Sequence, residues 1–169
     1  MGATQNGDGG YATAGWAGGA QPILVVDRYA KSYGGRRAVD GVSLSVGAGS
    51  VFGFVGHNGA GQTTLIRSIV GELAFNEGDI RICGRSVCSD PVDCKRVVAY
   101  VPDNPDVYGF LTGSQYLNYV ADLFGVGVQE RRERIAHYAG RLGIDGRLGE
   151  LVSAYSHGMR QKLVLVGAF

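Results

Sequence analysis

The chain has 169 residues, enough for one domain with a hydrophobic core. Its 16 Lys and Arg residues nearly balance its 15 Asp and Glu residues, so the net charge of +1 gives no sign of a nucleic-acid partner, and we expect none. No stretch approaches the roughly 20 apolar residues that a membrane-spanning helix needs.

The first 20 residues, MGATQNGDGGYATAGWAGGA, are rich in glycine and contain neither Lys nor Arg nor a sustained apolar run. This composition predicts a disordered tail over residues 1–20 rather than a secretory signal or an anchor. We expect the folded domain to cover residues 21–169. The three cysteines, Cys83, Cys88 and Cys94, lack paired CxxC spacing, which indicates reduced thiols in a cytosolic protein rather than a metal site.

The four segments that follow the tail predict three strands and then a helix. Residues Ile23–Val26 are rich in β-branched residues, and Val39–Val46 alternates apolar and polar residues as a half-exposed strand does. Val51–Val55 is wholly apolar and typical of a strand buried on both faces. Thr63–Leu73 has helical spacing. A glycine-rich loop therefore lies between a predicted strand and a predicted helix.

The next two predicted elements are also strands. Residues Asp79–Cys83, within GDIRICG, read as a strand and turn, and RVVAYVP at 96–102 as a buried strand stopped by Pro102. We expect Ile23–Val26, Val39–Val46 and Asp79–Cys83 to form an antiparallel β portion.

From Leu111 onward the pattern becomes helical. LTGSQYLNYVADLFG predicts an amphipathic helix ended by Gly125, and QERRERIAHYAGRLG predicts a second one closed by Gly143. We expect these helices to form a subdomain over about 103–149. Ser156 is placed to cap a further helix that starts near Gly158.

The loop GHNGAGQTT at 56–64 approaches the phosphate-loop pattern of Gly, four residues, Gly, Lys, then Ser or Thr. Gly56, Gly61 and Thr63 fit, but Gln62 stands in the lysine position. In so glycine-rich a chain the spacing alone is weak, and its weight comes from the flanking strand and helix. Converging backbone N–H groups at a helix start suit an anion. The alternative is a tight turn that binds nothing.

Three motifs in order carry a resemblance to a family. GHNGAGQTT, YSHGM at 155–159 and AYVPDNPDVYGFLTG between them, with KSYGGRRAVDGVSLSV upstream, resemble the nucleotide-binding domain of ATP-binding-cassette (ABC) transporters, in a variant common among bacterial exporter-type subunits. The resemblance runs from about Ile23 to Phe169. It implies an α/β fold: a P-loop NTPase core with an antiparallel β portion and a helical subdomain.

The resemblance also implies a site for ATP and Mg²⁺. Tyr33 would stack on adenine, Thr63 would ligate Mg²⁺ and Thr64 would contact the α-phosphate, while the loop backbone wraps the β-phosphate. Asp103 would sense Mg²⁺. Ser156 and Gly158 would meet the γ-phosphate bound by the other subunit of a head-to-tail dimer. The implied nucleotide-binding residues are Tyr33, Gly56, Asn58, Gly59, Ala60, Gly61, Gln62, Thr63, Thr64, Asp103, Ser156 and Gly158.

Two of these residues have plainer interpretations. Tyr33 could be an ordinary turn tyrosine, and Ser156 a helix cap and nothing more. Arg160 and Lys162 favour the nucleotide interpretation of Ser156, because cations near a helix N-terminus oppose the macrodipole unless an anion lies nearby.

The sequence departs from the family in three places. Asp103 replaces the usual Gln, which is tolerable because Asp also ligates a hard cation. Gln62 removes a charged phosphate contact, at a cost of roughly 1.5–3 kcal/mol in binding, and a transition-state stabiliser. Phe169 is the last residue, whereas the family's metal-organising Asp, catalytic Glu and switch His follow the signature helix. We therefore expect a truncated cassette that binds ATP weakly and does not hydrolyse it, and we predict no catalytic residue in this chain.

A folding expectation accompanies this one. If Val51–Val55 is a sheet strand without its neighbours, its apolar edge is unpaired, and the chain should be marginally stable and prone to aggregate.

The implied function is that of an ATP-binding subunit that energises export through a membrane permease. Such a subunit is cytoplasmic, lies peripherally on the inner face of the cell membrane and pairs with a second cassette. The alternative is a non-enzymatic nucleotide-binding or interaction module that pairs with a complete cassette. A GTPase or kinase is disfavoured because no NKxD motif is present and YSHGM would be unexplained. Soluble cassette proteins of translation or DNA repair usually carry tandem cassettes or long coiled coils, which this chain lacks.

Overall fold

A computed structural model describes residues 22–56 and 61–169. The chain divides into two compact units, one ending at Val98 and the other running Ala99–Phe169, and each is described by itself. The predicted tail, residues 1–20, lies outside the described residues. Within the described part of the chain, no helix combines the length and the apolar character that crossing a membrane requires.

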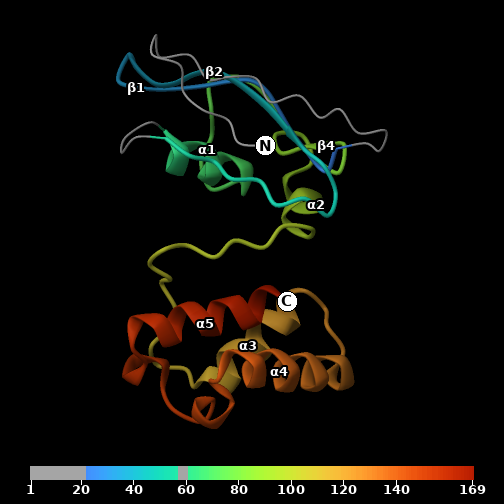
Figure 1. Ribbon diagram of the computed structural model, residues 1–169, viewed down its shortest axis with the longest axis vertical. Coiled ribbons are helices and arrows are strands. Elements are labelled where there is room, and N and C mark those ends of the chain that lie inside the picture. Colours follow the sequence, from blue (N-terminus) through green and yellow to red (C-terminus); the bar gives the residue numbers. More distant parts are fainter. Residues whose placement is uncertain (1–21, 57–60) are drawn as a thin grey trace. The chain divides into compact units, whose positions relative to one another are not determined.

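The first unit contains a four-stranded antiparallel sheet with the order β2-β1-β3-β4 (Figure 1). Its strands are β1 Leu24–Tyr33, β2 Arg36–Val46, β3 Glu77–Ile82 and β4 Arg85–Ser86. The antiparallel β portion predicted from the sequence is confirmed. The half-exposed character predicted for the second strand is also confirmed, since buried Val39, Val42 and Leu44 are separated by exposed and half-buried residues.

Two backbone features shape strand β1. Gly34 and Gly35 have φ angles of 53° and 80° and form the two-residue turn to β2, where positive φ matches the twist of the strands. Arg28, with φ 47°, lies at a register shift opposite Gly78. A Cβ atom on Gly78 would lie 2.4 Å from the carbonyl oxygen of Asp27, so this close approach requires glycine.

Helices α1 (Gln62–Ile69) and α2 (Pro91–Lys95) lie on one face of this sheet (Figure 1). Leu65 of α1 and Cys94 of α2 are buried against the sheet residues in one apolar core. Helix α1 ends four residues before the predicted Leu73. The chain turns at Gly71, whose φ of 72° is left-handed and does not continue a helix.

The prediction that Val51–Val55 forms a buried strand is wrong. Val51 is 97% exposed and Val55 68% exposed, while Phe52 and Phe54 pack against the core of the first unit. Phe54 takes part in a single bridge, and the four-stranded sheet does not include the segment. An apolar run records the preference for burial but not the presence of a neighbouring strand. Because this segment is not a strand of the sheet, the expectation that it leaves an unpaired apolar strand edge is also wrong.

The prediction of a buried strand over 96–102 is also wrong. The backbone N–H of Arg96 donates to the carbonyl of Val92 at 3.1 Å, and that of Val97 donates to Cys94 at 3.2 Å. These bonds continue the turn of α2, so the donors are engaged locally rather than in a ladder. Val97 and Val101 are exposed.

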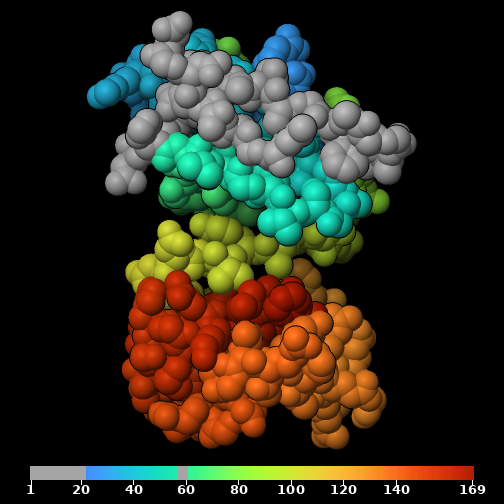
Figure 2. All heavy atoms as spheres, in the orientation of Figure 1, coloured from blue at the N-terminus to red at the C-terminus, as the bar shows by residue number. Residues whose placement is uncertain are grey.

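The second unit is helical. Its elements are α3 Gly113–Leu123, α4 Val128–Leu142, α5 His157–Ala168 and the short 3₁₀ turns η1 Asp145–Arg147 and η2 Val152–Ala154. Figure 2 shows the atoms of α4 and α5 packed directly against one another, as their many contacts require. The buried core of this unit consists of Leu117, Ala139, Ile144, Val152, Tyr155, Leu163 and Val166.

The ends of these helices are fixed by residues close in sequence. Helix α3 begins with a capping box, in which the N–H of Gln115 donates to the Thr112 hydroxyl at 3.2 Å and the N–H of Thr112 donates to the Gln115 side chain at 2.8 Å. Helix α4 ends at Gly143, in the left-handed conformation. The three helices predicted from the sequence are confirmed, including the cap at Ser156.

Candidate functional site

The start of α1 differs from the starts of α3 and α5. Its N-cap residue is Gly61, left-handed with φ 83°, and no side chain among the described residues caps this end. The helix begins with a bond of 2.8 Å from the Leu65 N–H to the Gly61 carbonyl, and its first turn contains no acidic residue. The first N–H groups of a helix have no partner within the helix and carry partial positive charge, so this end suits an anion.

Gln62, in the lysine position of the loop pattern, is half-buried. Its side-chain amide donates to the backbone carbonyl of Gly56 at 3.0 Å, which joins the two ends of the predicted phosphate loop. The amide is neutral, so this side chain brings no charge to the helix start. Asn58, Gly59 and Ala60 lie outside the described residues.

The two threonines of the motif lie in the first turn of α1. Thr63 is exposed, and Thr64 is half-buried. A Mg²⁺ ion bound with a nucleotide takes most of its oxygen ligands from phosphate and water, so one exposed protein hydroxyl, at Thr63, fits the chemistry of such an ion.

A buried polar pair connects α1 with strand β1. The hydroxyls of Tyr29 and Ser68, both almost fully buried, hydrogen-bond at 2.8 Å, and the Tyr29 hydroxyl also donates to the Thr64 carbonyl at 3.4 Å. Burial raises the pKa of Tyr29, although the bond to Ser68 opposes that shift. The pair fixes the helix that carries the threonines against the strand that carries Tyr33. Sequence reasoning missed it, yet Ser68 lies three residues after buried Leu65, and a polar residue on a buried helix face needs a partner.

Tyr33 lies at the end of β1, beside the Gly34–Gly35 turn, and is 50% exposed. The Lys31 ammonium lies 5.1 Å from the centroid of its ring. The structure thus places Tyr33, Gly56, Gly61, Gln62 and the two threonines in one compact unit. An accessible aromatic ring and an anion-suited helix start are the two features that a nucleotide needs.

The remaining predicted residues belong to the second unit. Asp103 is exposed, and its backbone carbonyl accepts a bond of 2.9 Å from the Gln161 side chain, which ties the segment before α3 to α5. The Ser156 hydroxyl accepts from the Met159 N–H at 3.3 Å, and Gly158 is exposed in the first turn. Asp103, Ser156 and Gly158 therefore all belong to the second unit.

Arg160 is the cation that led us to expect an anion near Ser156. One of its Nη atoms donates to the Ser153 carbonyl at 3.4 Å, and its Nε atom is buried without a hydrogen-bond partner in the described part of the chain. Lys162 is exposed. The anion at this helix start remains a prediction.

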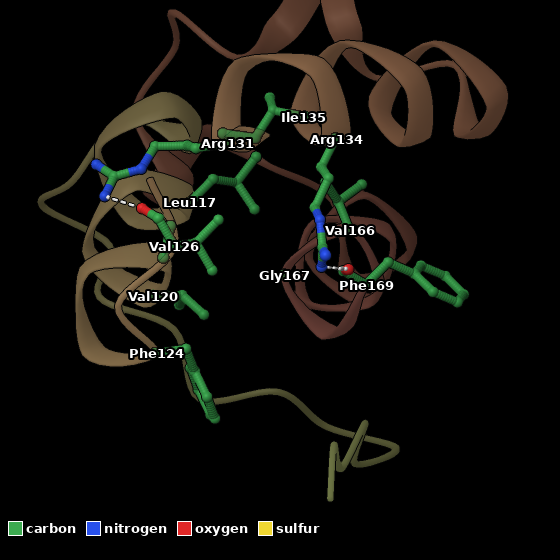
Figure 3. Close-up of a pocket in the computed structure, with 11 residues that line it drawn as sticks. Leu117, Val120, Phe124, Val126, Arg131, Arg134, Ile135, Val166, Gly167 and Phe169 are labelled. Carbon is green, nitrogen blue, oxygen red and sulfur yellow. Dashed lines mark hydrogen bonds between the residues drawn. The ribbon is translucent and has the colours of Figure 1, made fainter. Parts of the chain in front are cut away.

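A cavity of about 60 Å³ lies in the second unit between α3, α4 and α5 (Figure 3). It is far smaller than the roughly 300–1,000 Å³ of typical ligand pockets, so it does not fit a nucleotide. Arg131 and Arg134 reach its rim, but their guanidinium groups donate to the carbonyls of Val126 at 3.0 Å and Phe169 at 2.7 Å. Nothing in the sequence had indicated this cavity.

The comparisons with known proteins decide the family. The model of the ABC transporter family matches residues 39–169, most of the chain. The chain belongs to the ABC transporter family. The ABC transporter ATP-binding protein YhcH of Bacillus subtilis, itself uncharacterized, is 36% identical over 143 residues, which cover 85% of this chain and 46% of that protein.

Two further relatives of this ABC chain are named for what they do. The daunorubicin/doxorubicin resistance ATP-binding protein DrrA of Streptomyces peucetius is 37% identical over 145 residues, 85% of this chain and 44% of DrrA. The SkfA peptide export ATP-binding protein SkfE of Bacillus subtilis is 30% identical over 148 residues, 86% of this chain and 60% of SkfE. The chain spans about half the length of the first of these relatives.

Solved structures confirm the predicted fold class. The ATP-binding subunit of an ABC transporter superimposes with a TM-score of 0.82 at 29% identity, over 86% of this chain and 61% of that one. A second structure, cbiO1 from Clostridium perfringens, shares the fold with a TM-score of 0.74 at 21% identity, over 88% of this chain and 61% of that one.

Proposed function

We propose that this ABC chain is the nucleotide-binding part of an export ATPase subunit, and that it binds ATP with Mg²⁺ on its first unit. The observation that carries the proposal is the start of α1, where a left-handed Gly61, an absent side-chain cap and an acid-free first turn leave backbone donors suited to phosphate. The names of DrrA and SkfE, a drug-resistance and a peptide-export protein, support export.

Each residue of the first unit has a role in this proposal. Backbone N–H groups from Gly61 to Thr64 hold the phosphates, Thr63 ligates Mg²⁺, and the exposed ring of Tyr33 receives the adenine base, since an aromatic face holds a base without specific hydrogen bonds. Loop residues Asn58, Gly59 and Ala60 belong to the same phosphate cradle by resemblance.

Gln62 makes this site weaker than one with lysine. Its amide is neutral and donates to the Gly56 carbonyl, so it supplies no charge to the β- and γ-phosphates. The missing charge-assisted contact costs roughly 1.5–3 kcal/mol in nucleotide binding. Phosphoryl transfer depends almost entirely on positioning and electrostatic stabilisation, so we propose that this chain hydrolyses bound ATP poorly or not at all.

The second unit carries the proposed contacts with partners. Ser156 and Gly158 would meet the nucleotide of a second cassette, and Asp103 would respond to Mg²⁺. ABC ATP-binding subunits work with membrane permeases, so we place this chain on the cytoplasmic face of the cell membrane beside such a permease.

The second candidate function is a non-enzymatic module that binds nucleotide and pairs with a complete cassette. The Gln62 side chain favours it, because its bond to Gly56 closes the loop ends on each other without any charge for the transferred phosphate.

Titration calorimetry with MgATP tests the proposal. We expect weak binding that Thr63→Ala and Tyr33→Ala reduce, whereas Tyr119→Ala, a matched change of an exposed tyrosine in the second unit, leaves it unchanged. Phosphate release by the same protein tests the proposed loss of hydrolysis: we expect binding without turnover, and steady turnover would contradict that part of the proposal. A wild-type chain that binds no MgATP contradicts both candidate functions.

A further inference from the structure

Lys31 accompanies Tyr33 on strand β1. Its ammonium lies 5.1 Å from the centroid of the Tyr33 ring, within the distance at which a cation is attracted to an aromatic face. Lys31 pairs with Val39 of the neighbouring strand, and Tyr33 pairs with Arg36, so the hairpin backbone holds both residues in place.

The charge of Lys31 has no acidic partner among residues 22–56 and 61–169. Arg37, on the adjacent strand, contrasts with it, because its guanidinium forms ion pairs with Asp40 and with Glu77, the latter at 3.0 Å. The ring of Tyr33 is therefore the group on which the Lys31 ammonium acts. It is half-buried, and its stem does not move as freely as that of a fully exposed lysine.

An aromatic ring has two faces. A cation over one face leaves the other for a flat ligand, and it limits the rotation of the ring about its side-chain bonds. A ring that is held before binding loses less conformational entropy when a base stacks on it. The positive charge also withdraws electron density from the ring, which favours stacking with the electron-rich face of a purine.

We propose that Lys31 is a positioning residue for the purine base: it holds the Tyr33 ring from one face so that adenine stacks on the other. This inference rests on the proposed function, since it requires that Tyr33 receives the base. Lys31 acts through the ring and not on the phosphates, so its effect depends on the presence of both the base and the tyrosine.

The test uses the full chain and two ligands, MgATP and magnesium tripolyphosphate, which has the phosphates but no base. Lys31→Met keeps the length and apolar stem of the side chain and removes its charge, and Lys31→Arg keeps a cation over the ring. Lys95→Met, in α2 of the same unit, is the matched control for the loss of one lysine charge.

We expect Lys31→Met to weaken MgATP binding about two- to fivefold, the range of an exposed cation–π contact. Lys31→Arg and Lys95→Met should bind as the wild type does. Tripolyphosphate affinity should be the same in every variant. In a Tyr33→Ala background, Lys31→Met should have no further effect on MgATP.

Five results overturn the inference. An equal loss of tripolyphosphate binding would mean that Lys31 acts on phosphates, and an undiminished effect in the Tyr33→Ala background would mean the same. Tighter MgATP binding by Lys31→Met would mean that lysine covers the face the base needs. Wild-type affinity in Lys31→Met, with weaker binding in Tyr33→Ala, would refute this inference and leave the proposed function standing. A wild-type chain that binds no MgATP refutes both.

Discussion

Helices α1 and α5 both begin at a glycine-containing motif of the family, but their first turns are stabilised differently. Ser156 caps α5 with its own hydroxyl, which accepts from the Met159 N–H. Helix α1 begins at a left-handed Gly61, and no side chain in the part of the chain that the structure describes caps it. A side-chain cap contributes about 1 kcal/mol to a helix. At the start of α5 the chain's own side chain therefore satisfies one of the first N–H groups, whereas the start of α1 has no such cap from the described residues and leaves its donors to a ligand.

This difference separates folding from binding along one chain. The α5 end can form in the absence of nucleotide, because its cap and its buried residues belong to the second unit. The α1 end gains its missing acceptors when an anion binds, so nucleotide should add more stability there. Four changes test how far this division holds.

The largest expected effect comes from the core beneath α5. Leu163 is fully buried in the second unit, and Leu163→Ala should lower the free energy of unfolding by about 2–5 kcal/mol through lost burial and the cavity left behind. Denaturant titration monitored by circular dichroism measures it. Ile66→Ala on the exposed side of α1 is the control and should cost far less. Equal losses would mean that α5 is not anchored by this core.

Placing a lysine at position 62 should strengthen nucleotide binding at the start of α1. Gln62→Lys adds a charge beside the phosphates and should tighten MgATP binding about tenfold or more, as measured by titration calorimetry. Gln62→Met removes the bond to the Gly56 carbonyl without adding a charge, and should not tighten binding. Equal affinities of the wild type and Gln62→Lys would place the phosphates elsewhere.

Removing the cap of α5 tests its independence from ligand. Ser156→Ala should lower stability by about 1 kcal/mol, because the Met159 N–H loses its acceptor. MgATP affinity of the isolated chain should stay the same, since the proposed site lies on the first unit. Ser153→Ala, an exposed serine three residues earlier, is the control. A large loss of MgATP binding would show that the two helix starts are coupled.

The accuracy of sequence reasoning depended on how local the sequence signal of each element was. The helices of the second unit were predicted correctly because their caps, Thr112, Gly143 and Ser156, act within a few residues. The strands predicted at 51–55 and 96–102 were wrong, because a strand depends on a neighbour that composition does not reveal.

For the candidate site, the motif predicted Gly61, Gln62 and Thr63. The positions of Lys31 and Tyr29 relative to it could not be predicted, because they depend on the register shifts in β1. Those shifts follow from the left-handed Arg28 and the close approach of Gly78, neither of which a periodic pattern records.

The smallest expected effect is a change in how the stability of the first unit depends on pH. In the first unit, the Asp79 carboxylate accepts hydrogen bonds of 2.7 Å from the Ser86 hydroxyl and from Arg81, and these bonds, that from Ser86 first, lower the pKa of Asp79. A lowered folded-state pKa adds stability that is present above the ordinary pKa of aspartate and is lost as the pH falls through the folded value.

Ser86→Ala should bring the pKa of Asp79 back toward its ordinary value and lower stability at pH 7 by about 0.5 kcal/mol, after allowance for solvent screening of this partly exposed group. The difference from the wild type should shrink as the pH falls below the ordinary pKa of aspartate, about 4, and through the lowered folded-state pKa, until the carboxyl is protonated in both proteins. Denaturant titrations at pH 7 and pH 3 measure it. Ser89→Ala, which removes a hydroxyl that donates to Asp90 on the surface of the same unit, is the matched control. A pH-independent loss in Ser86→Ala would assign the effect to the packing of β4 rather than to the Asp79 charge.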